Sequence, residues 1–365
     1  MGKELVPATG IVCITKTSRL MENLFFKKYS SIENSFDAEY MEKVRREVPQ
    51  DTVFVVQEKV HGSNVSFVCA LLDEEMHFAK RTAFVEEDEN FFNWKEFVPK
   101  YENRIRKVCS LVKEYVPEAV SCNIFGEMFG GSYPHPDVKR CPGLPSIQKG
   151  VFYCPSHEFY GFDIFCVTPS SAYYLPVDTV GKIFSLAGIL YAETLLEGGL
   201  DDCLHYSNAF PSTIPSKLGL PPLEDNICEG IVIRPKVPIN LSSGARVIIK
   251  SKNARFAEKK AHRDKVPQKS VEYTEELSLL LSNVADYITE PRIGNVTSKV
   301  GQMSFPREFG KMLGLYSKDV IEDFLKGYGT DYYELSKAEQ KLFNRNVNSL
   351  CSAFLKDKLL TDGLH

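Results

Sequence analysis

Two apolar runs joined by a short polar turn are the feature that most constrains the fold of this chain. Residues 51–72 read "DTVFVVQEKVHGSNVSFVCALL". The β-branched residues on both sides of the turn predict two strands, over 51–60 and 64–72. Lys59 closes the first strand, and Gly62 follows in the turn. A glycine there permits a tight turn and lets a ligand approach the backbone, so the lysine at this junction is a candidate functional residue.

The rest of the first 260 residues mixes strand and helix patterns. Apolar spacing predicts helices over 34–48, over 97–116 from Pro99 onward, and over 176–190. Further strand-like runs lie at 75–85, 120–131, 157–167, 226–235 and 244–253. No regular alternation of strand and helix with a Gly-rich phosphate loop is present, which disfavours a Rossmann or P-loop fold. The pattern therefore predicts an α+β body with antiparallel sheets.

The pattern changes near residue 270. Three later segments, "TEELSLLLSNVADYITEPR", "FPREFGKMLGLYSKDVIEDFLKGYG" and "ELSKAEQKLFNRNVNSLCSAFLKDKLL", all have helical spacing. The polar stretch 261–273 separates them from the body. We therefore predict an N-terminal extension over 1–24, a first domain over 25–265 and an all-helical domain over 270–365.

Composition predicts an intracellular protein. No run approaches the roughly 18 apolar residues that span a bilayer, and no secretory signal is recognisable, which predicts no membrane partner. The ten cysteines are scattered, with no Cys-x-x-Cys pair. This favours buried thiols in a reducing, most simply cytoplasmic, compartment over disulfides or a zinc site.

Charge is unevenly distributed along the chain. The formal net charge of −4 argues against a protein that coats nucleic acid. One segment, 246–269, is nonetheless strongly basic and reads "RVIIKSKNARFAEKKAHRDKVPQK". It suits a partner that bears phosphates, and a solvated basic helix is the open alternative.

Several residues outside the turn could carry chemistry with Lys59. A lysine amine becomes a nucleophile when burial or nearby cations lower its pKa. Lys250 and Lys252 alternate along one predicted strand, so their side chains share a face. Glu127 and Glu229 lie in strand-like runs beside glycines and apolar residues, where a carboxylate can meet a divalent metal or a sugar hydroxyl.

The order of these motifs resembles a known superfamily. The series "EKVHGSN", "KRTAF", "FGEMFGG", "FYGFDIF", "EGIVIRP" and "VIIKSKN" is similar to that of the covalent nucleotidyltransferases, which are ATP-dependent ligases and mRNA capping enzymes. The form with His61, where the other branches usually carry an acid, resembles the RNA ligase 2 family. That family includes a phage double-strand RNA ligase and the trypanosome RNA-editing ligases. The resemblance also reaches "NVTSKVGQMSFPREFGKMLGL" in the helical region.

The resemblance implies both a fold and an activity. The fold is an antiparallel-sheet, ATP-grasp-like adenylation domain followed by a small all-helical domain that engages RNA. The activity is ATP-dependent sealing of RNA ends that carry a 3′-hydroxyl and a 5′-phosphate, at nicks in duplex RNA. It proceeds through AMP bound covalently to Lys59 and through adenylylated RNA, with Mg²⁺ or Mn²⁺ as cofactor. A monomer is the family's default.

The motif match also implies roles for single residues. Phe162 stacks on the adenine, Glu58 helps to place it, and Glu127 hydrogen-bonds the ribose. Lys250 and Lys252 grip the α-phosphate.

Other matched residues act on the metal, the phosphates or the RNA. Glu229 holds the metal. Arg81, His61 and Asn64 serve phosphates, pyrophosphate or RNA ends. Arg292 matches an arginine of the family's helical domain, which implies a contact with RNA phosphates. The role of Asp163 stays open between the site and a structural hydrogen-bonding function.

Two alternatives belong to different classes of protein. A DNA ligase or a GTP-dependent capping enzyme of the same superfamily would need an OB-fold, a run of short strands after 246–253. The sequence there predicts helices instead. A catalytically silent RNA-binding protein would not need Lys59, Glu229, Lys250 and Lys252 together.

Overall fold

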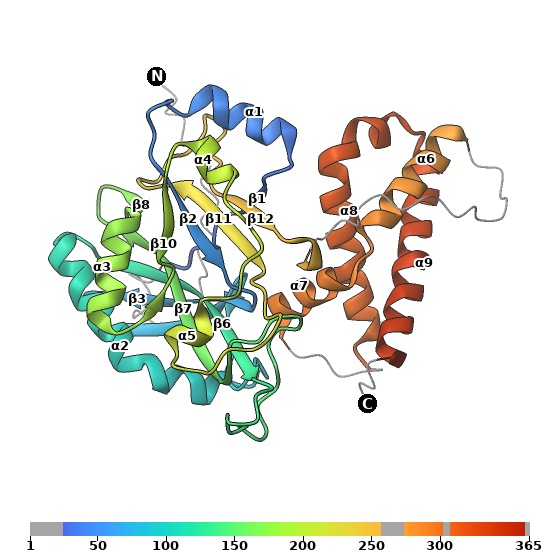
Figure 1. Cartoon of the computed structure of the whole chain (residues 1–365). Coiled ribbons are helices and arrows are strands. Elements are labelled where there is room, and N and C mark those ends of the chain that lie inside the picture. The colour runs from blue at the N-terminus through green and yellow to red at the C-terminus, as the bar shows by residue number, and fades with distance from the viewer. Residues whose placement is uncertain (1–24, 257–273, 302–306, 362–365) are drawn as a thin grey trace.

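The computed structural model describes residues 25–256, 274–301 and 307–361. The predicted N-terminal extension and most of the basic residues of 246–269 lie outside these ranges. Figure 1 shows two parts: a body built around two sheets, and a helical part beside it that contains the last described residues. The prediction of an α+β body followed by an all-helical region is confirmed.

The first sheet, sheet A, has five strands in the order β1-β12-β11-β2-β10. All neighbours in it are antiparallel except β1 and β12. The strands are β1 (Glu33–Asn34), β12 (Ile249–Lys252), β11 (Gly230–Pro235), β2 (Phe54–Lys59) and β10 (Thr194–Gly198). α1 (Ala38–Glu47) and α4 (Leu200–Leu204) pack on one face, where Val44 and Cys203 meet Val56 and Ile231.

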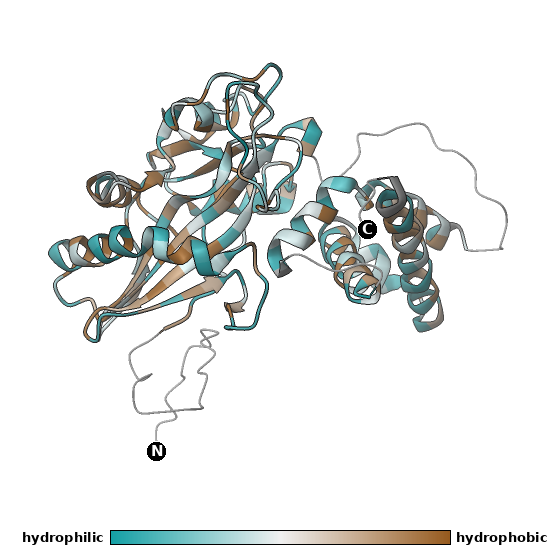
Figure 2. Ribbon diagram, turned by 90° about the horizontal axis from the view of Figure 1, so that it is seen from below, coloured by the Kyte–Doolittle hydropathy of each residue, from teal (hydrophilic) through white to brown (hydrophobic). Residues whose placement is uncertain are grey.

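The second sheet, sheet B, has seven strands in the order β5-β4-β3-β6-β7-β8, with β9 paired in parallel to β7. Its strands are β3 (Ser63–Ala70), β4 (Glu75–Lys80), β5 (Ala83–Phe84), β6 (Ser121–Ser132), β7 (Cys154–Val167), β8 (Ala172–Tyr174) and β9 (Leu190–Tyr191). α2 (Trp94–Tyr115) and α3 (Val177–Ala187) cover its outer face. Hydrophobic and hydrophilic residues are interspersed along both the strands and the helices (Figure 2).

The inner faces of the two sheets meet around a mixed aromatic and aliphatic layer. Phe125 and Phe165 of sheet B pack there with Tyr29 and with Ile248, which precedes β12. Val60, just after β2, joins a neighbouring cluster with Tyr153 and Tyr160. Side chains alternate across a strand, so every second residue of β2, β11 and β12 points into this layer. The short α5 (Ile214–Lys217) and the 3₁₀ turn η1 (Ala254–Phe256) lie at its edge.

The helical part has a hydrophobic core of its own. Its elements are α6 (Glu275–Val284), the 3₁₀ turn η2 (Ala285–Tyr287), α7 (Glu290–Val300), α8 (Phe309–Glu334) and α9 (Lys337–Thr361). Val320, Phe324 and Val347 are buried at its centre. No strand occurs within 274–301 or 307–361, so those residues hold no OB-fold. None of the helices in the described ranges has both the length and the apolar character needed to cross a bilayer.

Two helices begin several residues away from the predicted starts. The first helix begins at Ala38 rather than at residue 34, because Asp37 accepts a hydrogen bond from the Tyr40 amide and caps it. α2 begins at Trp94, so Pro99 lies inside the helix instead of in its first turn. Burial of Phe97 and Tyr101 against sheet B outweighs the backbone bond that this proline removes.

Candidate active site

Lys59 and Lys252 lie in one cross-strand row of sheet A. Gly230 of β11 is the register partner of Lys59 on β2 and of Lys252 on β12. Directly opposed residues project from the same face of a sheet, so both lysine side chains point into the layer between the sheets. The glycine leaves the space between them open. This row is the centre of the site.

Glu229 joins the two lysines from the residue just before β11. Its carboxylate accepts a bond of 2.6 Å from Lys59 Nζ and one of 3.0 Å from Lys252 Nζ. His61 Nδ1 lies 3.7 Å away. The Glu229 side chain is only 1% exposed, and such burial by itself raises a carboxyl pKa. The charges of Lys59, Lys252 and His61 outweigh it and hold the pKa of Glu229 at about 2.

The low pKa of Glu229 limits what this carboxylate can do. A base with a pKa of about 2 takes up almost no proton at neutral pH. Glu229 is therefore an ionised anchor that fixes the position of the Lys59 amine rather than a proton acceptor. Lys59 keeps 18% of its side-chain surface exposed and can be reached from solvent.

The central row tolerates no side chain at Gly230. Its φ is +151°, and a Cβ there would lie 2.1 Å from the backbone oxygen of Ser251. We expect Gly230→Ala to lower the free energy of unfolding by about 2 kcal/mol or more, since strand β12 must move away. The measurement is a urea melt of both proteins.

Gly188→Ala is the matched control for that substitution. Gly188 also has a positive φ, at +68°, but a Cβ there would meet nothing within 4 Å. It should therefore cost only the backbone strain of about 1 kcal/mol. Equal losses in the two variants would contradict the close packing of β11 against β12.

A second row of the same face holds Gln57, Val232 and Lys250. They are register partners across β2, β11 and β12, two residues along from the first row. Gln57 is buried and donates to the Ala192 backbone oxygen at 2.5 Å, while Lys250 stays partly exposed. The structure therefore brings Lys250 and Lys252 onto one face with Lys59, as the alternation predicts.

The opposite wall of the site belongs to sheet B. Asn64 of β3 and Glu127 of β6 are register partners and share its inner face. Glu127 retains some exposure, yet protein surrounds most of its carboxylate. This burial raises the pKa of Glu127 to about 8, with a further rise from Glu229, against the opposing charges of Lys59 and Arg81. Arg81 follows β4 and makes no ion pair within the described part of the chain.

The raised pKa of Glu127 gives a testable pH dependence. A carboxyl whose folded pKa of about 8 exceeds its ordinary 4.5 favours the fold while it is protonated. That contribution is present below pH 4.5 and is lost as the pH rises toward 8. We expect Glu127→Gln to remove this loss, so that urea melts of the two proteins diverge by a few kcal/mol between these pH values. Parallel pH profiles would contradict the burial of this carboxyl.

Glu58 points away from Lys59, on the face of sheet A that carries α1. Its carboxylate accepts bonds of 2.7 Å from Ser212 Oγ and of 2.9 and 2.6 Å from the Thr213 amide and hydroxyl. Burial raises the pKa of Glu58, against these hydrogen bonds. The Glu58 side chain holds the segment that leads into α5. Of Glu58, only the backbone is therefore available to the side of the sheet where Lys59 lies.

His61 and Ser63, which follow β2, contact the helical part. The His61 amide donates to Tyr153 Oη at 2.9 Å, and its ring lies 5.6 Å from that of Phe256. A Cβ at Gly294 of α7 would lie 3.8 Å from His61 Nε2, and Ser63 Oγ donates to the Ser298 backbone oxygen. Helix α7 therefore lies against one edge of the site.

A close backbone contact, which the sequence does not reveal, explains why residue 62 is a glycine. A Cβ at this position would lie 2.3 Å from the Met128 backbone oxygen of β6. The glycine thus lets the turn after β2 pass close to sheet B. This contact brings Lys59 and Glu127 to the same space.

Phe162 lies in the inner layer beside the site. It falls at an irregularity of β7, where the register with β6 shifts between Phe125 and Gly126. Its ring is 5.0 Å from that of Tyr29, and it packs against the clusters of Val60 and of Phe125. The ring is only partly buried, which leaves a face for a ligand.

Asp163 has a structural role. It is fully buried and accepts bonds of 2.9 Å from Tyr29 Oη, 2.8 Å from Arg234 and 2.5 Å from Arg246. These partners come from three different segments, so the carboxylate ties sheet A to sheet B. Of the two roles left open by the sequence, the structure favours the hydrogen-bonding one.

Arg292 does not face a ligand, and the prediction that it contacts RNA phosphates is wrong. It is 1% exposed, and its guanidinium donates to Asp319 at 2.7 Å and to Asp323 at 2.8 Å. Its Nε donates to the Tyr287 backbone oxygen. The arginine joins α7 to α8 inside the helical part.

Several supporting residues were not predicted from the sequence. Gly230 could have been found, since it follows Glu229 inside an apolar strand. Tyr153, Ser212 and Thr213 come from turns far along the chain and belong to no motif, so only the fold brings them to β2.

The groups around Glu229 could hold a divalent cation only if a ligand with several negative charges were bound as well. Both carboxylate oxygens already accept from lysines, and three positively charged or titratable groups surround them. Mg²⁺ commonly binds through one or two carboxylates plus substrate phosphates. A triphosphate would supply the negative charge that these side chains lack.

Comparisons with known proteins give the family. Residues 52–252 match the family model "RNA ligase", and residues 271–353 match "T4 RNA ligase 2 C-terminal". "RNA-editing ligase 2, mitochondrial" of Trypanosoma brucei brucei is 26% identical over 358 residues, covering 82% of this chain and 83% of that protein. "RNA-editing ligase 1, mitochondrial" of the same organism is 29% identical over 357 residues, covering 80% and 74%.

Solved structures overlap more weakly with this chain. An RNA ligase of Naegleria gruberi aligns with 64% of it and 58% of its own chain, at 14% identity and a TM-score of 0.42. An archaeal ATP-dependent RNA ligase aligns with 93% of this chain and 66% of its own, at 13% identity and a TM-score of 0.38. Both overlaps are too low to bear on function. The two family models cover both parts of the chain, and on that ground the protein belongs to the RNA ligase 2 family of RNA ligases.

Proposed function

We propose that this protein is an ATP-dependent RNA ligase that joins a 3′-hydroxyl to a 5′-phosphate at nicks in duplex RNA. One observation carries the proposal: in a chain of this family, Lys59 is accessible and is fixed by Glu229 beside Lys252. Phosphoryl transfer depends on such positioning and on neutralising charge. The names of the trypanosome relatives, both RNA-editing ligases, support an RNA substrate.

The first step places AMP on Lys59. The Nζ atom forms a bond to the α-phosphorus of ATP, and the bond from that phosphorus to pyrophosphate breaks. The amine must leave its bond to Glu229 and lose a proton before it attacks. Glu229, with its pKa of about 2, is a poor acceptor for this proton, so the proton passes to the incoming phosphates or to solvent.

The second and third steps return Lys59 to its starting state. An oxygen of the RNA 5′-phosphate attacks the α-phosphorus, the P–N bond breaks, and the 5′ end carries AMP. The 3′-hydroxyl oxygen then attacks the 5′-phosphate, and AMP leaves with the bridging oxygen. Lys250 and Lys252 face the same space as Lys59 and would hold the phosphate through these displacements.

Other residues of the site would bind the rest of the nucleotide. We assign the partly exposed ring of Phe162 to the adenine and Glu127 to the ribose, where its raised pKa keeps a proton to donate. The Glu58 backbone, with Asn64, His61 and Arg81, would complete the contacts to base, phosphates or RNA ends. A bound Mg²⁺ or Mn²⁺ would neutralise the triphosphate, and Glu229 would help to hold it.

We assign the catalytic domain to residues 25–265 and the RNA-engaging helical domain to 270–365, acting as a monomer in the cytoplasm. The separate hydrophobic core of the helices and the family model over 271–353 support this division.

A DNA ligase or capping enzyme is disfavoured, because the described residues after β12 contain no strand for an OB-fold. A silent RNA-binding protein would not need the buried Lys59–Glu229–Lys252 arrangement, which costs desolvation energy.

The substrate is tested with four matched nicked duplexes. They place RNA or DNA on the 3′-hydroxyl and 5′-phosphate strands of the same sequence, alongside a single-stranded RNA with the same ends. We expect sealing of the all-RNA nick with ATP and Mg²⁺, and little sealing of the single strand. Preferred sealing of the all-DNA nick would contradict the proposal.

A further inference from the structure

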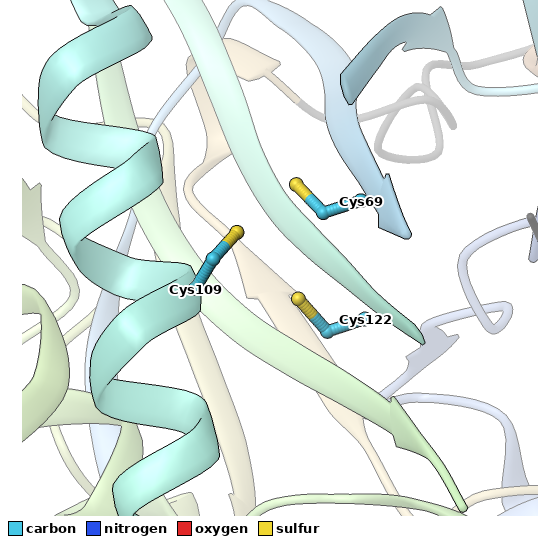
Figure 3. A group of neighbouring side chains, drawn as sticks. All are labelled: Cys69, Cys109 and Cys122. Atoms are coloured by element: carbon cyan, nitrogen blue, oxygen red, sulfur yellow. The ribbon is translucent and has the colours of Figure 1, made fainter. Parts of the chain in front are cut away.

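Three cysteine sulfurs gather on the outer face of sheet B, away from the active site. Cys69 of β3 and Cys122 of β6 are register partners, and Cys109 reaches toward them from α2 (Figure 3). Their three sulfurs all lie within 4.8 Å of one another. The sequence gives no hint of this group, since the three residues are 40 and 13 positions apart and follow no metal-binding spacing.

The group is enclosed by the main hydrophobic core. Cys69 and Cys122 are buried among the residues that join sheet B to α2, and Cys109 packs against them with part of its surface exposed. The Cys109 thiol is hydrogen-bonded to those of Cys69 and Cys122, and the charge of Arg106 lies nearby. Three sulfurs this close to one another can serve as ligands of a single ion.

We propose that Cys69, Cys109 and Cys122 form a closed three-sulfur site for one soft metal ion, with Cu(I) as the physiological ion that fits it. Three properties support the choice. Thiolates select soft ions. The sulfurs are close enough to share one ion after small rotamer changes. No His, Cys, Asp or Glu within the described residues completes a fourth position in this group, which disfavours the tetrahedral Zn²⁺ of structural sites.

Metal binding at this position would connect α2 to two strands of sheet B. The ion would displace the thiol protons, and Arg106 would offset part of the negative charge of the thiolates. Because the ligands come from separate segments, an ion that binds the folded chain alone would raise its melting temperature. The site would stabilise the sheet that carries Glu127 without touching the residues assigned to ligation.

The full-length protein is reduced, stripped of metal and titrated anaerobically with Cu(I) against a coloured Cu(I) chelator. We expect one tightly held ion per chain and a higher melting temperature. Cys109→Ser, which changes a partly exposed position, should weaken binding at least about a hundredfold and abolish the thermal shift. Cys69→Ala and Cys122→Ala should do the same.

Cys166→Ala is the matched control. Cys166 is the next register partner of Cys122 on the same face of sheet B and is also buried, yet it lies outside the three-sulfur group. It should retain the ion. Absence of a tightly held Cu(I), retention of it by Cys109→Ser, or its displacement by equimolar Zn²⁺ would overturn the proposal. These readouts do not depend on ligase activity.

Discussion

We expect Lys59→Ala to abolish the transfer of AMP from ATP to the protein. The variant lacks the accessible amine that lies in the row with Gly230 and Lys252 and is held by Glu229. Loss of a covalent nucleophile typically removes about a thousandfold or more of the rate. The measurement is retention of label on a denaturing gel after incubation with α-phosphate-labelled ATP and Mg²⁺.

The fold should survive this substitution. Lys252 still pairs with the buried Glu229 carboxylate, so no isolated charge remains in the core. Lys59→Arg should also fail to take AMP, because a guanidinium stays protonated and is a poor nucleophile. Lys43→Ala, at an exposed position of α1, is the matched control and should label normally. Label that persists in folded Lys59→Ala would remove Lys59 from its assigned role.

We expect Glu229→Gln to reduce adenylylation on the order of a hundredfold or more. The amide keeps the shape of the side chain but removes the charge that holds Lys59 at 2.6 Å and Lys252 at 3.0 Å. The two ammonium groups would then repel each other across Gly230. Glu197→Gln is the control, since Glu197 pairs with Lys236 at the exposed edge of the same sheet.

The same substitution should change the acid sensitivity of the fold. The pKa of Glu229 is about 2 in the folded protein and about 4.5 ordinarily. Its charge therefore stabilises the fold above pH 4.5, and this stabilisation is lost as the pH falls from 4.5 toward 2. Glu229→Gln should lose less free energy of unfolding over that range than the unmodified protein. An equal loss in both proteins would contradict the buried ion pairs at Glu229.

The sequence predicted the parts of the fold that follow from local pattern. The strands predicted around Lys59 are present as β2 and β3. Their β-branched residues point alternately to the two faces of the strand, and both faces are buried. The alternation of Lys250 and Lys252 places both on one face, as expected. The helical pattern after residue 274 was equally clear, because its apolar residues recur at helical spacing and form one core.

Properties that depend on tertiary contacts could not be predicted. Arg292 matched a family arginine, yet its surroundings in the fold are two aspartates and a carbonyl. Asp163 could only be assigned once Arg234 and Arg246 were seen beside it. The side-chain direction of Glu58 follows from the strand's alternation, but its partners Ser212 and Thr213 come from a distant turn.

The cysteines illustrate the same limit. Their scatter predicted free thiols, and all nine cysteines in the described residues are free. Their grouping was invisible in the sequence, because Cys69 and Cys122 become neighbours only through the register of β3 and β6. Cys109 joins them because α2 packs across that sheet.

The most direct test of the central claim is to locate AMP on the protein. The purified protein is incubated with ATP and Mg²⁺, digested, and its peptides are analysed by mass spectrometry for the mass of AMP. The account predicts one modified peptide, with AMP on Lys59, and loss of that modification when nicked RNA is added. AMP on another residue, or a modification that forms with GTP in place of ATP, would contradict it.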